Sequence, residues 1–91
     1  MKTFFNISVG SKLWAPEDFE SYLVEAETFV EAAIRGQDFV DALNAALGRK
    51  FPKKWREDDA FLQCVFRGTG QTLATPEAVE EFVSLAEYEF D

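Results

Sequence analysis

Histidine is absent from this sequence, and cysteine occurs once, as Cys64. Without histidine the chain lacks the side chain that most often acts as a general base near neutral pH, and with it the Ser-His and Cys-His pairs of many nucleophilic enzymes. A single cysteine forms no internal disulfide and supplies no zinc site, and between apolar neighbours it is predicted to be a small buried hydrophobe. We therefore expect a protein that is not an enzyme and that binds no cofactor and no metal.

Long hydrophobic runs are missing as well. The apolar stretch that begins at Phe4 is interrupted at Asn6 and Ser8, so it is too short for the core of a signal peptide, and no stretch has the length of a membrane span. A lone cysteine suits a reducing compartment, so we expect a cytoplasmic protein that does not contact the membrane. No linker or low-complexity segment divides the chain, and residues 1–91 are predicted to form a single compact domain.

Acidic residues outnumber basic ones. The chain has 17 Asp and Glu against 9 Lys and Arg, which gives a net charge of −8. A field of this sign repels the phosphates of duplex nucleic acid and attracts basic partners, so direct duplex binding is not expected. Ten phenylalanines, two tryptophans and two tyrosines supply apolar mass for one folded core.

Alternating apolar and polar residues predict strands. Residues 3–9 and 60–67 alternate in this way, and each of these strands precedes a glycine-containing turn. After the turns, residues 12–15 and 71–74 are predicted to be short return strands. Together these segments predict a small antiparallel sheet.

Helical spacing of apolar residues predicts two long helices and one short one. The first covers residues 16–34, because Pro16 suits the first helical position and Gly36 suits the end of a helix. Residues 39–47 give a short second helix, and residues 76–90 give the third. The predicted fold is therefore α+β, with two or three helices packed on one face of the sheet, approximately in the order ββα-α-ββα.

A faint internal repeat relates residues 15–23 to residues 75–83. Both segments place a proline and an acid at the start of a predicted helix, and both follow a predicted strand and a turn. Two interpretations stay open. The repeat indicates either a duplicated strand–turn–strand–helix unit or the common chemistry with which helices begin.

The acids are concentrated on the two longer predicted helices. Glu20, Glu27 and Glu31 fall on one flank of the first helix, with Val24 among them and exposed. Surface helices usually mix charges, because like charges four residues apart destabilise a helix. Neither helix has a base between its first and last acid, and a binding role would explain this layout. The candidate partner-binding residues are Glu20, Glu27, Glu31, Glu77, Glu80, Glu81 and Glu87.

Five of the nine basic residues lie within residues 49–56, which contain no acid. This segment is predicted either to fold across the acidic helices and neutralise them or to hold a ligand, since cations interleaved with aromatics suit single-stranded nucleic acid. The favoured alternative for the aromatics is that Phe51 and Trp55 fill the core while the cations face water. The secondary candidate residues are Arg49, Lys50, Lys53, Lys54, Trp55 and Arg56.

The charge layout favours a non-enzymatic acidic binding protein. Its rows of carboxylates are expected to imitate a nucleic-acid backbone and to inhibit a basic, nucleic-acid-binding partner protein. In small size, acidity and lack of catalytic residues the chain resembles phage-encoded inhibitors of host defence, including anti-CRISPR proteins, although it shares no residue motif with them. The alternative is a structural or oligomerising interaction module with a solvated acidic surface. The protein is expected to be a monomer or a homodimer.

Overall fold

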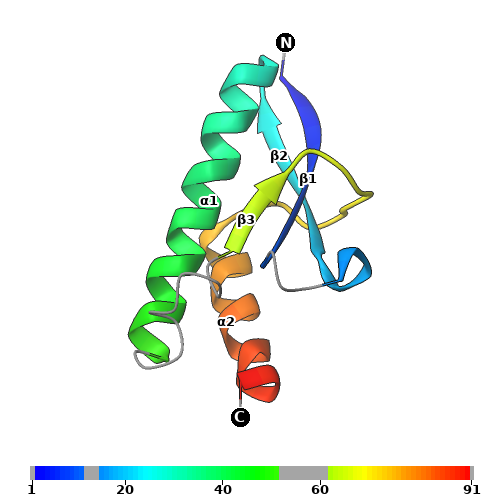
Figure 1. Cartoon of the computed structure of the whole chain (residues 1–91). Coiled ribbons are helices and arrows are strands. Elements are labelled where there is room, and N and C mark those ends of the chain that lie inside the picture. The colour runs from blue at the N-terminus through cyan, green and yellow to red at the C-terminus, as the bar shows by residue number, and fades with distance from the viewer. Residues whose placement is uncertain (1, 12–14, 52–61, 91) are drawn as a thin grey trace.

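The computed structural model describes residues 2–11, 15–51 and 62–90. Within them, three antiparallel strands form one sheet and two α-helices lie beside it (Figure 1). The elements in chain order are β1 (Thr3–Ser11), a 3-10 turn (Pro16–Asp18), β2 (Glu20–Ala26), α1 (Phe29–Lys50), β3 (Leu62–Val65) and α2 (Pro76–Phe90). The predicted α+β class is therefore confirmed.

The central strand of the sheet is β1, since the strand order is β2-β1-β3. Ile7 lies opposite Tyr22 on β2, and Ser8 lies opposite Val65 on β3. Residues 7–11 of β1 are buried on both faces. Ile7 and Val9 face the main core, while Ser8 faces the other side of the sheet.

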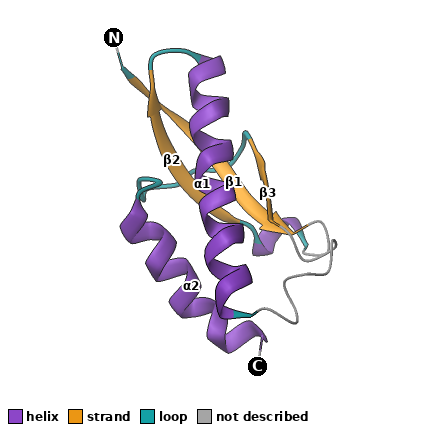
Figure 2. Cartoon of the chain, turned by 90° about the vertical axis from the view of Figure 1, so that its left-hand side faces the viewer, coloured by secondary structure: helices purple, strands orange, loops and turns teal. Residues whose placement is uncertain are grey.

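Helix α1 lies across the core face of the sheet (Figure 2). Thr28 caps its start, because the Thr28 hydroxyl accepts a hydrogen bond from the Glu31 amide at 3.1 Å. About a third of the way along, Gly36 lets the helix approach the sheet: a Cβ there would lie 3.2 Å from Cys64 Sγ and 3.6 Å from Ile7 Cδ1. The core is built from the buried side chains of Ile7, Val9, Tyr22, Val24, Ala26, Ala32, Phe39, Val40, Leu43, Leu47, Leu62, Ala78 and Phe82.

The connection from β3 to α2 covers the second face of the sheet. The Ser8 hydroxyl donates to the Arg67 carbonyl oxygen at 2.9 Å, and the Gly70 amide donates to Asn6 Oδ1 at 2.9 Å. Residues 72–74 then run along the outer edge of β2, where the Leu23 amide donates to Thr72 O at 2.8 Å and the Ala74 amide donates to Leu23 O at 2.9 Å. This connection ends at α2, which runs beside the C-terminal half of α1 (Figures 1 and 2).

The predicted helix over residues 16–34 is wrong except for residues 29–34, which form the start of α1. Residues 16–18 form a 3-10 turn and residues 20–26 form β2, in which Tyr22, Val24 and Ala26 are buried at alternate positions. The predicted exposure of Val24 is wrong too, because this side chain is 4 % exposed. The apolar residues of this segment fit both a helical and a strand period, and the segment forms a strand because it pairs with β1.

The helix boundaries also differ from the prediction. Helix α1 passes through Gly36, which was predicted to end a helix, and it continues to Lys50, so the short helix predicted over residues 39–47 is part of α1. Gly36 allows α1 to pack closely against the sheet and does not end the helix. The predicted order ββα-α-ββα is not found, and the two segments of the faint repeat adopt different structures.

The remaining strand and helix predictions have mixed outcomes. The strand over residues 3–9 and the helix over residues 76–90 are confirmed, and residues 62–65 of the predicted strand 60–67 form β3. Residues 71–74 do not return beside β3, and their one bridge is a parallel pairing of Leu73 with Leu23. The other predicted return strand, 12–15, lies largely outside the described residues.

Candidate binding surface

The three acids predicted to share a helix flank lie on three different elements. Glu20 is on β2, Glu27 is in the connection that follows β2, and Glu31 is in the first turn of α1. The Glu31 carboxylate accepts a hydrogen bond from the Glu27 amide at 3.2 Å and from Arg35 Nε at 3.0 Å. Both hydrogen bonds lower the pKa of Glu31, and the bond from the Glu27 backbone amide has the larger effect. Glu31 therefore helps to cap α1 and is committed to that role.

Helix α2 carries three of the predicted binding residues on its first two turns. Glu77, Glu80 and Glu81 are all exposed. Thr75 caps the helix by accepting from the Ala78 amide at 3.3 Å, and Glu77 in the first turn also suits the positive end of the helix dipole. Glu87 belongs to the same helix, but its side chain is outside the described part of the structure.

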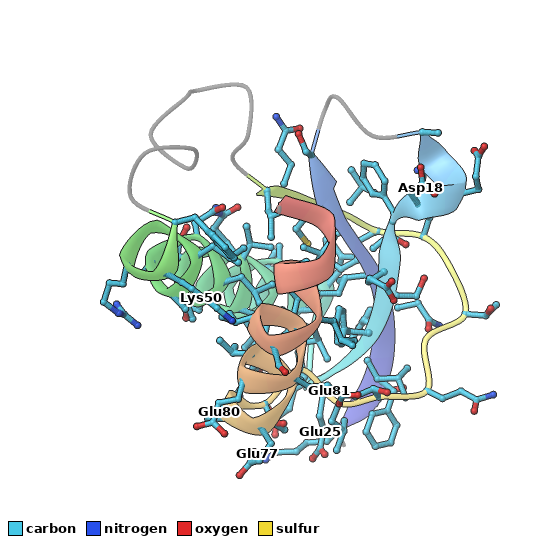
Figure 3. The ribbon with its side chains drawn as sticks, turned by 90° about the horizontal axis from the view of Figure 1, so that it is seen from below. Asp18, Glu25, Lys50, Glu77, Glu80 and Glu81 are labelled. Carbon is cyan, nitrogen blue, oxygen red and sulfur yellow. The ribbon has the colours of Figure 1, made fainter. Side chains whose placement is uncertain are left out.

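The acids of α2 meet acids of β2 around Tyr22. Burial, together with the smaller effects of the nearby carboxylates of Glu20 and Glu81, raises the pKa of Tyr22 to about 12, so β2 and α2 each place a carboxylate near the same phenol. Glu25 lies near the start of α2 from the other face of β2, because Glu25 and Thr75 line the same cavity of about 200 Å³. Figure 3 shows Glu25, Glu77, Glu80 and Glu81 gathered on one side of the molecule, with Asp18 lying apart. We call Glu20, Glu25, Glu77, Glu80 and Glu81 the acidic edge.

Few cations approach the acidic edge. Among the described residues, Lys2 is the one base paired with a carboxylate of this surface, and its Nζ lies 3.9 Å from Glu25 Oε1. Arg35 lies nearby but pairs with Glu31 at 3.0 Å. No three acidic or sulfur side chains within the described ranges are grouped to hold a metal ion. The acidic edge is thus a surface of like charge whose neutralisation within the described structure is slight.

The basic segment is only partly described. Arg49 is exposed in the last turn of α1, and Lys50 Nζ donates to the Val83 carbonyl oxygen of α2 at 3.1 Å. Lys53, Lys54, Trp55 and Arg56 lie outside the described residues, so the structure does not test whether the segment neutralises the acids or holds a ligand. Arg49 and Lys50 line an open groove of about 1000 Å³ between α1 and α2. The apolar side chains that line this groove include Phe39, Ala46, Val79 and Val83.

A second surface has the opposite character. The Phe29 ring, 58 % exposed, stacks on the Phe66 ring with 4.4 Å between ring centroids, and Phe5 meets Phe29 edge-on at 6.3 Å. Val30 and Ile34 are also exposed here on the first turns of α1. We call Phe5, Phe29, Val30, Ile34 and Phe66 the apolar end.

Comparisons with protein-family models, with curated proteins and with solved structures give no match. Function must therefore be argued from the surfaces of this chain. Within the described residues, neither helix combines the length and the apolar character that crossing a membrane requires.

Sequence reasoning missed one acid of the surface and all of the apolar end. Glu25 was not a candidate residue, because only the strand pairing and residues 72–75 bring it near α2. Phe29 and Ile34 were predicted to lie at the end of a helix that begins at residue 16, whereas they lie exposed on the first turns of α1. Phe5, Phe29 and Phe66 are far apart in the sequence, and only the folded chain brings their rings together.

Proposed function

We propose that this protein is a non-enzymatic acidic binding protein that uses the acidic edge to hold a basic partner protein. The supporting observation is that β2 and α2 bring five exposed carboxylates to one edge and that, of the described cations, Lys2 alone pairs with them. Like charges held together on a rigid sheet edge and helix destabilise the fold slightly, so their retention favours a role in binding.

The partner best suited to this surface is a nucleic-acid-binding protein. Carboxylates at fixed positions on two rigid elements can occupy cationic sites that otherwise hold phosphates, which makes the chain an inhibitor by mimicry. This is the mode that its class-level resemblance to phage-encoded anti-CRISPR inhibitors also implies. The proposed contact residues are Glu20, Glu77, Glu80 and Glu81, together with Glu25. Glu31 has a structural role, and Glu27 lies at the margin.

A matched pair of charge reversals tests this proposal. Proteins retained by the parent chain from the native host are titrated against Glu77→Lys/Glu81→Lys and against Glu17→Lys/Asp18→Lys, which changes the net charge equally on the exposed 3-10 turn. The first variant is expected to bind about 100-fold more weakly, since close charge pairs at interfaces contribute several kcal/mol. The second variant should lose much less affinity, because it changes only the long-range attraction that comes from the net charge of the protein.

Two outcomes contradict the proposal. Equal losses in both variants would show that net charge alone matters, and unchanged affinity in the first variant would remove the acidic edge as the contact surface. Parent binding must also weaken as salt rises, because exposed charges are screened over roughly 8 Å at physiological ionic strength.

The competing proposal is an oligomerising module. Val24 is buried and offers no contact to a second copy, but the exposed rings of the apolar end favour this proposal. Light scattering at low and high salt distinguishes the two proposals. A stable dimer that persists at all salt concentrations and is abolished by Phe29→Ser would favour the module, whereas a monomer leaves the acidic edge available to a partner.

A further inference from the structure

Strand β1 is paired on both sides along only part of its length. Residues 3–9 pair with β2, but β3 pairs only with residues 8–11. Next to residues 3–7, the position that β3 would occupy if it were longer is not filled by any described strand. β3 ends at Val65, and the chain then turns away from β1. The Arg67 carbonyl oxygen already accepts a hydrogen bond from the Ser8 hydroxyl on the second face of the sheet.

The backbone groups that face this open position can be identified from the hydrogen bonds of β2. Leu23 uses both its amide and its carbonyl with residues 72–74, so both groups point away from β1. Opposite residues of an antiparallel pair alternate between bonded and non-bonded positions, so Asn6, opposite Leu23, is a non-bonded position, as is Phe4 two residues earlier. The amide and carbonyl groups of Phe4 and Asn6 therefore point into the open position, and no described residue bonds them there.

Apolar side chains flank the open position on both faces of the sheet. Phe5, Phe29 and Phe66 lie on the core face, where Phe66 is 37 % exposed. Phe4 lies on the second face and is 54 % exposed. Side chains of an added strand alternate between the two faces, so successive residues would meet one or the other of these apolar sets.

We propose that this edge of β1 receives an extended peptide segment from another protein by strand addition, with aliphatic residues at alternate positions and cationic residues at its ends. The unpaired amides and carbonyls of Phe4 and Asn6 supply main-chain bonds, and the flanking rings select apolar side chains. The net charge of −8 supports the cationic ends, and the exposed Glu27 precedes Phe29 by two residues in the chain.

A second copy of the chain fits this edge less well than a peptide does. The contact would involve only five residues of β1. A stable dimer needs a much larger interface, since it buries roughly 800 Å² per partner. A second copy would also bring its own net charge of −8 against the first. A short segment of opposite charge avoids both difficulties.

The probe is a capped eight-residue peptide of alternating valine and threonine with a lysine at each end. Its binding to the full chain is followed by amide hydrogen exchange and chemical shifts. Exchange at Phe4 and Asn6 is expected to slow at least tenfold at saturating peptide. The same peptide with every amide nitrogen methylated should give no protection, because the methyl groups keep the two backbones apart and the peptide has no N–H to donate to the carbonyls of Phe4 and Asn6. A version with glutamate ends should bind about tenfold more weakly.

A proline substitution isolates the main-chain contribution. Phe4→Pro removes the Phe4 amide donor, while the bonds of β1 to β2 belong to the alternate residues and remain. Its control, Phe4→Val, keeps the donor and the strand propensity. Peptide affinity should be at least tenfold lower in Phe4→Pro than in Phe4→Val. The slowing of Asn6 amide exchange is measured in the parent protein, so that result does not depend on how well a variant folds.

Three results would overturn the inference. One is the absence of protection at Phe4 and Asn6 with millimolar peptide. Another is equal affinity in the proline and valine variants. The third is protection of these amides without peptide that rises with protein concentration, since this would assign the edge to a second copy of the chain.

Discussion

The acidic edge and the apolar end lie on different parts of the same sheet, and they contribute to the fold in opposite ways. At the apolar end, rings from β1, α1 and the residue after β3 contact one another, so exposure is combined with stabilising contacts. At the acidic edge, β2 and α2 bring like charges together, and among the described residues only Glu25 has an ion-pair partner. The first surface helps to hold the fold together, whereas the second weakens it slightly. This difference makes the acidic edge the stronger candidate for a surface kept for binding.

The largest expected effect lies between the two regions, where α1 approaches the sheet. Gly36→Leu would place a side chain where even a Cβ lies 3.2 Å from Cys64 Sγ, and it should lower the free energy of unfolding by about 3 kcal/mol. Chemical denaturation measures this loss. The control is Gly36→Ala, in which tight packing is offset by better helix propensity, worth about 1 kcal/mol. Equal losses in both variants would mean that α1 does not sit against β1 and β3 as described.

The next effect concerns the phenol beneath the acidic edge. The pKa of Tyr22 is about 12 in the folded chain against an ordinary value of 10.0. The unfolded chain therefore loses this proton first as pH rises, so the contribution of Tyr22 is fully present below pH 10 and is lost between pH 10 and 12. Denaturation across that window should show a loss of about 2 kcal/mol in the parent beyond the loss in Tyr22→Phe. Parallel curves for the two proteins would contradict the assignment.

A smaller loss is expected at the apolar end. Phe29→Ala removes the ring that joins Phe5 and Phe66 and should cost about 1 kcal/mol, because stacked aromatic pairs contribute on this scale. Val30→Ala, at an exposed neighbour without a ring contact, should change stability by less than about 0.5 kcal/mol. Thermal unfolding separates the two variants. If both are neutral, the apolar end contributes nothing to the fold and the comparison with the acidic edge loses its basis.

The smallest effect should have the opposite sign. Glu81→Gln removes one like charge beside Glu20 and Tyr22 and should stabilise the protein by a few tenths of a kcal/mol at low salt. Glu17→Gln, on the 3-10 turn, is the matched control and should be neutral. The gain must disappear at high salt, where exposed charges are screened. A loss of stability in Glu81→Gln would show that this carboxylate makes a contact that the fold needs.

The sequence predicted the last helix and its three described acids, because Thr75 and Pro76 start a helix by local chemistry alone. It did not predict β2, because Tyr22 and Ala26 occur at helical spacing and at strand spacing alike. Only pairing with β1, more than ten residues away, distinguishes the two periods. Two of the five residues of the acidic edge depend on that pairing, so Glu20 was assigned to the wrong element and Glu25 was not recognised. Gly36 was misassigned for the same reason, since its packing against Ile7 and Cys64 is not local.

The connection across the second face of the sheet determines the order in which the molecule can assemble. β1 and β2 are neighbours in sequence, and forming their pair closes only a short loop, whereas the Gly70 amide reaches Asn6 across 64 residues. The β1–β2 pair is therefore expected to form early in folding, and residues 66–74 to dock late, bringing α2 with them. The acidic edge would then be completed in the last step of folding. Pulse-labelling of the Gly70 and Ala74 amides during refolding would show whether they become protected after those of β1.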